Sequence, residues 1–488
     1  MTEEDIHRRG FADPAENGVS GLELTNIGDS ADSDDGNELN PLVGGIASSS
    51  PSKNPLPIVD DGHGTGAPGS ATTLQMVINI VISFVGAGLL GVPNAFSKSG
   101  WLLGGISLLT VSACNVYAML CLPAVQATLM QRQAHPPRKA DPNLIVPSPG
   151  APLQSYGDIG LALLGPRGER LVHVCLGISQ AGFATAYVIF IAANMYSIWK
   201  VPRLLVCAGC VPGLAALVQF RELKSLAPFS LLANTANFAA LTAVLLQDYE
   251  TYEDYHHPTQ PEEEDLADHS FSAVLWGGWL YVIAITIYSM EGVGMILSLK
   301  HSSAKPQHFS WLLSITIGVI SLFMVAFGVA GYAAFGKETE APITLNLKTD
   351  RHPKSATFVK LALCLGLYLT FPIMMFPIWS IVEGWSTAVR ESAPTRMMVR
   401  TAVVVGSATV AYLIPHFGKF LSLVGSSICT LLGFVLPCYF HVKVMGPELA
   451  VWQYRLDIGL LLGGSLFGIL GTIQSLMAMM KGELEDEV

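Results

Sequence analysis

The sequence predicts an all-α polytopic membrane protein, built from two five-helix repeats of opposite orientation and one additional helix. Three observations support this prediction. Of the 488 residues, 51% are hydrophobic and only 13% are charged, whereas soluble proteins carry about 25% charged residues. Eleven apolar runs are long enough to cross a bilayer, which takes about 20 residues each. The first and the sixth of these runs are both interrupted by glycines, which predicts a broken helix at the start of each repeat.

Residues 1–70 form a polar segment ahead of the first apolar run. They hold thirteen acidic residues against Arg8, Arg9 and Lys53. A chain of this composition cannot bury enough apolar surface to offset the entropy lost on ordering. We therefore expect a disordered acidic tail that could bind a cytosolic partner. It has no basic start followed by an apolar core, so the first span is expected to act as the insertion signal.

The apolar runs divide the rest of the chain into domains. They lie at 73–96, 101–126, 168–197, 203–219, 226–246, 273–299, 309–335, 357–382, 398–415, 419–443 and 456–478. The run 203–219 is the shortest and contains Pro212 and Gly213, so a ten-span alternative stays open. The predicted domains are a first repeat (71–246), an acidic lumenal or extracellular loop (247–270), a second repeat (271–443), an eleventh helix (444–480) and an acidic C-terminal tail (481–488).

Basic residues near the ends of the spans predict the orientation, since Lys and Arg are enriched on the cytosolic side. With the N-terminus inside, fourteen Lys and Arg residues fall on the inner side and nine on the outer side. The asymmetry favours a cytosolic N-terminus. An odd number of spans in each repeat then makes the two repeats antiparallel.

Glycines at two places in the apolar runs predict the functional site. One place is Gly86-Ala87-Gly88, and the other is the stretch from Ser289 to Gly292. An unpaired backbone amide is costly in hydrocarbon, so a broken helix is tolerated only where it is buried in protein or faces a watery cavity. Two broken helices in corresponding positions of two halves are typical of secondary transporters.

The polar residues exclude other classes of protein. All eight cysteines lie in apolar runs, where cysteine acts as a small hydrophobe, so no disulfide is expected. Cys207 and Cys210 form the one CxxC, and without a second pair or a nearby histidine it indicates packing. The sequence holds no recognisable nucleophile, metal cluster or phosphate loop. We therefore expect no enzyme, no cofactor, no metal and no nucleic-acid partner.

Motifs in a fixed order along about 400 residues resemble a known family. The longest runs from Val77 to Phe96 and is followed by Gly100-Trp101. The others are Ser155-Tyr156-Gly157-Asp158, Gln180 with Tyr187 and Asn194, Leu223 to Ser230, Met290 to Gly294, Gly331 to Gly336, Ile343 to Leu347, Thr370-Phe371-Pro372 and Leu423 to Ser426. Together they resemble the amino acid/auxin permease family, most closely its proton-coupled and plant vacuolar neutral amino acid branch.

The resemblance implies a LeuT-type fold of eleven spans that moves amino acids, commonly with protons. Animal lysosomal members carry a histidine, implicated in proton coupling, where this chain has Asn79. Asparagine does not titrate, so coupling through this position is not expected here. Plant vacuolar members resemble this chain in having asparagine, which favours a vacuolar or lysosomal membrane over the plasma membrane.

A zwitterionic amino acid would need one partner for its carboxylate and one for its ammonium. We expect amides freed at Gly86, Ala87 and Gly88 to bind the carboxylate, and carbonyls freed near Ser289 and Met290 to bind the ammonium. Gly292 completes the second break. Glycine lets the ligand approach the backbone closely. The alternative is that these glycines serve only helix packing.

Side chains near the breaks have candidate roles. Glu291 is costly at the bilayer centre, so it should face the interior, where it either titrates or orders the broken helix. Tyr187 could reach the carboxylate or bond a neighbouring helix. Thr370 lies where sodium-coupled relatives place hydroxyl ligands, although a single hydroxyl favours packing as its role. The pocket flank is predicted from Phe84, Tyr288 and Trp279, which favours small neutral substrates.

Other charged residues are expected at the membrane interface. His173 and His441 lie near inner span ends and are predicted to be interfacial, and Lys360 is predicted to extend towards the outer interface.

The leading hypothesis is a proton-coupled transporter of neutral amino acids that works by alternating access in the lipid bilayer. A nutrient sensor that signals through the acidic tail and a sodium-coupled symporter are the alternatives.

Overall fold

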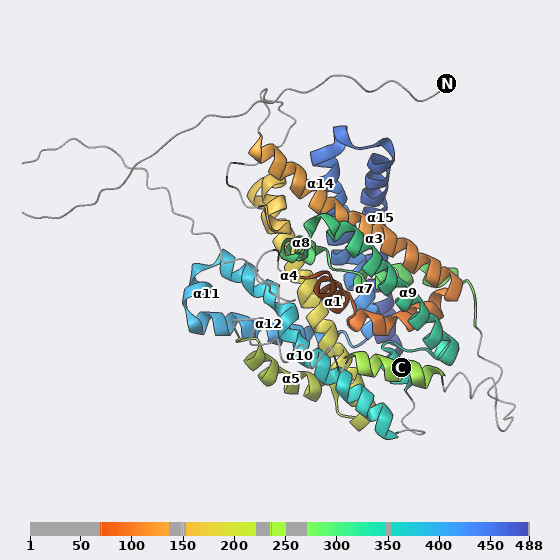
Figure 1. Cartoon of the computed structure of the whole chain (residues 1–488). Coiled ribbons are helices and arrows are strands. Elements are labelled where there is room, and N and C mark those ends of the chain that lie inside the picture. Colours follow the sequence, from red (N-terminus) through yellow and green to blue (C-terminus); the bar gives the residue numbers. More distant parts are fainter. Residues whose placement is uncertain are drawn as a thin grey trace, which may run out of the picture. The chain divides into compact units, whose positions relative to one another are not determined.

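The computed structural model describes residues 69, 71–135, 148, 150, 153–220, 235, 237–249, 271–347 and 353–486 (Figure 1). These residues belong to one compact unit. The predictions for the acidic tail, for most of the loop 247–270 and for the motif 223–230 fall outside the described residues. Within them, helices form almost all of the structure, as the sequence predicts.

The first half holds α1 (Thr73–Phe84), η1 (Ala87–Gly91), α2 (Val92–Ser99), α3 (Trp101–Ala134), α4 (Tyr156–Trp199) and α5 (Arg203–Leu217), with residues 237–249 also helical. The second half holds η2 (Trp276–Gly278), α7 (Trp279–Ser289), η3 (Val293–Met295), α8 (Ile296–Ser302), η4 (Pro306–His308), α9 (Phe309–Phe335), η5 (Gly336–Glu338), η6 (Ile343–Asn346), α10 (Pro353–Trp385), α11 (Thr387–Glu391), α12 (Ala393–Leu413), α13 (Phe417–Val424), η7 (Gly425–Cys429), η8 (Leu431–Val435), α14 (Leu436–Met445), η9 (Gly446–Glu448) and α15 (Val451–Asp486).

Each of the eleven apolar runs contains helix in its described part. Fewer than eleven of the described helices, however, are long and apolar enough to cross a membrane. Seven of the described helices qualify as spans, and the bent pair of α1 with η1 and α2 makes eight. The helix α5 has only 15 residues, and α12 has Arg396 and Arg400 in its first half. The count of eleven therefore stays a prediction.

The first apolar run is interrupted at Val85 and Gly86. A capping box between Thr72 and Gln75 starts α1, which ends at Phe84. The chain then passes through extended backbone at Gly86 and turns into η1, and its axis bends by 46°. Glycines and a proline at 86–93 explain the interruption, because each weakens helix in its interior.

The second interruption lies between α7 and α8. The helix α7 ends at Ser289, residues 290–292 are not helical, and η3 leads into α8. Gly292 lies directly against the ring of Phe84, at a distance that leaves no room for a side chain. The two interrupted segments therefore pack against each other.

The helices contact one another in two groups, which we define by their members. The first group contains α1, α2, α3, α7, α8 and α9, and the second contains α4, α5, α10 and α12. Each group combines neighbouring helices from both halves of the chain. Figure 1 shows α1 and α7 at the centre of the described part, close to α4.

The last helices pack on the first group. α14 contacts α3, and α15 contacts α13, α14 and the π-helical turns η7 and η8. α15 begins at Val451, earlier than the apolar run 456–478, and continues to Asp486. The helix thus extends into the segment 481–488 that the sequence predicts as a tail.

Two expectations for interfacial residues are wrong. His441 is 4% exposed, and its Nδ1 lies 2.8 Å from an oxygen of Asp457, which is fully buried. Lys360 is 1% exposed and donates to the hydroxyl of Ser197 at 2.9 Å. Each polar partner lies on another helix, and for this reason the apolar pattern around a single residue could not reveal it. All eight cysteines are free.

Candidate functional site

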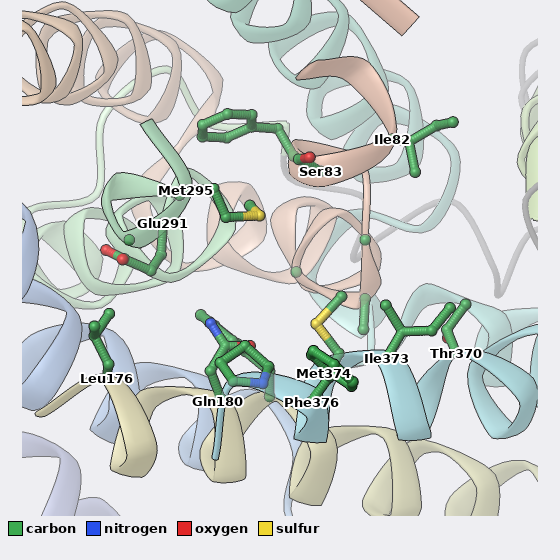
Figure 2. A pocket seen from close by; sticks show the side chains of 18 of the residues that line it. Ile82, Ser83, Leu176, Gln180, Glu291, Met295, Thr370, Ile373, Met374 and Phe376 are labelled. Carbon is green, nitrogen blue, oxygen red and sulfur yellow. The ribbon is translucent and has the colours of Figure 1, made fainter. Parts of the chain in front are cut away.

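A cavity of about 210 Å³ lies where the two interrupted segments meet the second helix group. This is several times the ~30 Å³ that a water molecule occupies in the liquid, so the cavity has room for a small organic solute. Figure 2 shows side chains from four elements around it: Ile82 and Ser83 from α1, Leu176 and Gln180 from α4, Glu291 and Met295 from the second break, and Thr370, Ile373, Met374 and Phe376 from α10.

The first interruption presents backbone amides to this cavity. Gly86, Ala87 and Gly88, the residues predicted to bind the carboxylate, all line it. The first bond of η1 runs from the Leu89 amide to the Gly86 carbonyl at 3.2 Å. Since an initial helical turn leaves its preceding amides without intrahelical partners, the amides of residues 86–88 are available to an anionic group.

The second interruption presents carbonyls. The Glu291 amide donates to Tyr288 at 3.4 Å, and the Met290 amide donates to Thr286 at 2.9 Å. The Met290 carbonyl is already used, because Asn115 on α3 donates to it at 2.6 Å. Of the two carbonyls predicted to bind the ammonium, only that of Ser289 therefore has no hydrogen-bond donor among the described residues. Met290 itself does not line the cavity.

The two breaks touch at Gly88 and Ser289. A Cβ on Gly88 would lie 2.6 Å from the Ser289 hydroxyl and 2.9 Å from its Cα. Backbone cannot move away as a flexible side chain can, so this approach requires glycine. Freed amides and freed carbonyls are thereby held next to each other.

Aromatic and hydroxyl side chains line the cavity opposite the first break. Tyr187 and Thr370 both line the cavity, and the Tyr187 hydroxyl lies 3.9 Å from the Cβ position of Gly86. Tyr288 packs edge-on against Phe183, with ring centroids 4.8 Å apart. The Tyr288 hydroxyl is buried and has no hydrogen-bond partner among the described residues. It can therefore donate to a bound solute.

Among the described residues that line the cavity, Glu291 contributes the one carboxylate, and none is Lys or Arg. Glu291 is 9% exposed, as expected for an interior residue, and its carboxylate lies near the backbone N–H of Val293 in η3. A Cβ on Gly433 would lie 3.4 Å from Glu291 Oε2 and 3.5 Å from Asn115 Oδ1. Both oxygens thus face the same small space, and Asn115 Oδ1 has no donor among the described residues.

Asn79 and Trp279 lie away from the cavity. Asn79 is buried in α1, where its carbonyl accepts from the Ser83 hydroxyl at 2.7 Å, but it does not line the cavity. Trp279, expected on the flank, is 44% exposed and contacts Trp276.

Three polar residues were not assigned to the site from sequence. His173, predicted at the membrane interface, and Asn237 instead line the cavity from two helices, and Asn115 contacts the second break from a third. All three residues lie far from both breaks in the sequence. The one signal that the sequence offers for each is an isolated polar residue in an apolar run, which does not indicate contact with the site.

Comparison with known proteins identifies relatives over most of the chain. Residues 69–477 match the family model described as transmembrane amino acid transporter protein. Amino acid transporter AVT3A of Arabidopsis thaliana is 34% identical over 406 residues, covering 81% of this chain and 87% of its own length. Vacuolar amino acid transporter 3 of Saccharomyces cerevisiae is 27% identical over 392 residues, covering 77% of this chain and 52% of its own.

Among solved structures, a crystal structure of MhsT in complex with L-phenylalanine covers 84% of this chain and 100% of its own, at 12% identity and a TM-score of 0.45. A similarity this low carries no argument about the fold.

Proposed function

This chain belongs to the transmembrane amino acid transporter family, a family of membrane transporters and not of enzymes, and we propose that it moves neutral amino acids together with protons. This proposal rests on one observation: the two interrupted helices contact each other and line the same cavity. Sodium coupling is the less favoured alternative, because the described cavity lining has only Glu291 as a carboxylate and no further anionic ligand.

The bound amino acid would lie across the two breaks. Its carboxylate accepts from the amides of residues 86–88, and its ammonium donates to the Ser289 carbonyl. The hydroxyls of Tyr187 and Tyr288 supply further donors. Because the described cavity lining holds no Lys or Arg, an acidic side chain would find no counter-charge there. Phe84, Phe183 and Phe376 offer apolar surface to a neutral one.

The proton would be carried by Glu291. Among the described residues Glu291 has no ion-pair partner, and a buried, unpaired carboxylate is costly in its charged form. In the protonated form its hydroxyl can donate to Asn115 Oδ1, whose amide nitrogen already holds Met290. Protonation would thus fix the second break in its binding geometry, while a hydrogen bond from the nearby Val293 amide to the Glu291 carbonyl oxygen would order the start of η3.

Replacing Asn115 by leucine tests this arrangement. Leucine has a similar volume but leaves the Met290 carbonyl without its donor, which costs about 1–3 kcal/mol for a buried group. We expect uptake to fall by about tenfold, since 1.4 kcal/mol corresponds to one factor of ten. Radiolabelled uptake at matched protein content measures the effect.

Ser112→Ala is the matched control for that variant. Ser112 lies on the same helix, is buried, and its hydroxyl has no partner among the described residues, so uptake should stay within about twofold of the unmodified protein, as expected for a small change in stability. An Asn115→Leu protein that transports at the unmodified rate would contradict the role of Asn115.

Alternating access would proceed by movement of the first helix group against the second. The cavity lies between them, with α1 and α7 on one side and α4 and α10 on the other. Each of the two helix groups contains helices from both halves of the chain. A LeuT-type inverted repeat of five plus five helices requires such mixing. The broken helices would then open and close the site from either side.

The membrane we propose is that of the vacuole or lysosome, with the N-terminus in the cytosol. A yeast relative carries the name vacuolar amino acid transporter, which supports this location. An acidic lumen would supply protons to Glu291 and drive amino acids towards the cytosol.

Flux in proteoliposomes tests the function. Neutral, acidic and basic radiolabelled amino acids are presented while the pH gradient and the sodium gradient are varied separately. We expect neutral amino acids to accumulate in response to the pH gradient whether or not sodium is present. Accumulation driven by sodium alone would overturn proton coupling, and binding without flux would instead support a sensor.

A further inference from the structure

A second group of polar residues lies outside the cavity, at the junction of α3, α14 and α15. It consists of Cys121, His441 and Asp457, which are 3%, 4% and 0% exposed. Their sulfur, nitrogen and carboxylate oxygen atoms lie within 4.8 Å of one another. The proposed transport mechanism uses none of these side chains.

The three side chains come from three different helices and point towards one another. His441 Nδ1 is 2.8 Å from Asp457 Oδ2, and Cys121 Sγ is 3.9 Å from Asp457 Oδ1. The Tyr117 hydroxyl donates to the same Oδ1 at 2.9 Å. It would therefore orient the carboxylate from outside the group, as hydrogen bonds commonly orient metal ligands.

Zinc fits this group in geometry and in charge. Tetrahedral zinc, with bonds of about 2.0–2.3 Å, places its ligand atoms about 3.3–3.6 Å apart. The separations here bracket that range, so side-chain movements of about 1 Å or less suffice. A thiolate, a carboxylate and a neutral imidazole carry two negative charges in total, which balance the charge of a divalent cation. This balance matters because an uncompensated charge is costly in a buried site.

We propose that Cys121, His441 and Asp457 bind a zinc-class divalent transition metal ion that fastens α15 to α3 and α14. Binding displaces the thiol proton of Cys121 and any proton on His441 Nδ1, as metal coordination requires deprotonated ligands. Mixed sulfur, nitrogen and oxygen ligands select zinc or cobalt over calcium and magnesium, which prefer oxygen alone. Three protein ligands leave one tetrahedral position for water.

The unmodified full-length protein provides the first test, because a thiolate bound to cobalt(II) absorbs light. The purified protein is stripped with a chelator, titrated with cobalt(II), and its spectrum is recorded. We expect one equivalent to produce a thiolate-to-cobalt charge-transfer band together with the visible bands of tetrahedral cobalt, and one equivalent of zinc to remove both. Absence of these bands would overturn the site.

Variants identify the ligands. Cys121→Ser and Asp457→Asn should each lower zinc affinity by at least tenfold in competition with a chromogenic chelator, and Cys121→Ser should abolish the charge-transfer band. Cys175→Ser is the control, since Cys175 is a buried cysteine of α4 and should leave the band intact. Equal zinc binding by Cys121→Ser, Asp457→Asn and unmodified protein would contradict the assignment. Amino acid uptake does not enter this test, so its outcome is independent of the proposed transport function.

Discussion

Alanine at position 88 is expected to reduce amino acid uptake by about 100-fold or more. Its methyl group would lie 2.9 Å from the Cα of Ser289 and 3.0 Å from its Cβ, closer than carbon atoms approach. The two interrupted segments must then separate by several tenths of an ångström, and a displacement of about 1 Å in a binding geometry can cost about 10²-fold in rate. Initial uptake rates in proteoliposomes, normalised to reconstituted protein, measure the loss.

Two other glycines show whether the loss is specific. At Gly318, on the exposed side of α9, an added Cβ meets no atom within 4 Å, so Gly318→Ala should transport normally. At Gly86 an added Cβ meets only the Tyr187 hydroxyl, at 3.9 Å, so Gly86→Ala should keep the packing and reduce affinity instead. Normal uptake by a correctly inserted Gly88→Ala protein would mean that the contact of the two breaks is not required.

Glutamine at position 291 is expected to abolish accumulation driven by a pH gradient while preserving exchange of one amino acid for another. Glutamine keeps a carbonyl oxygen that can accept from Val293, so the order of the second break is retained, but it cannot carry a proton. One pH unit is worth 1.36 kcal/mol, so coupling to one proton allows about tenfold accumulation per pH unit. In Glu291→Gln the ratio should fall to about one.

Glu291→Ala separates the two roles of this side chain. Alanine removes both the proton and the acceptor for Val293, so exchange should be lost as well as accumulation. Glu338→Gln serves as a control, because Glu338 is exposed in η5 outside the cavity. Full pH-driven accumulation by Glu291→Gln would contradict the proton-carrying role and leave only the ordering role.

The positions of the two breaks could be predicted from local sequence because their cause is local. The first run has three glycines and a proline within 86–93, and the second has Gly292 and Gly294, and these residues are unfavourable for helix in an apolar run. The structure has its interruptions at Val85–Gly86 and at 290–292, within a few residues of the prediction. Tyr187 and Thr370, which belong to motifs of the resemblance, line the same cavity as the first break, and their roles there stay predictions.

Contacts between distant helices could not be predicted in the same way. The bond from Asn115 to Met290 joins residues 175 positions apart, and no periodicity in either helix indicates it. The distance of His441 from a span end predicts an interfacial residue, yet its ring is paired with Asp457 on α15 and packs edge-on against Tyr117 on α3. Trp279, predicted on the pocket flank, lies instead at the first residue of α7, at the end of that helix opposite the second break, and is 44% exposed.

An experimental structure of the protein in a lipid nanodisc with a bound neutral amino acid tests the central claim most directly. We predict the carboxylate of the ligand within hydrogen-bonding distance of the amides of residues 86–88, and its ammonium beside the Ser289 carbonyl. A ligand bound elsewhere, with the two breaks unoccupied or wound into continuous helix, would contradict the account.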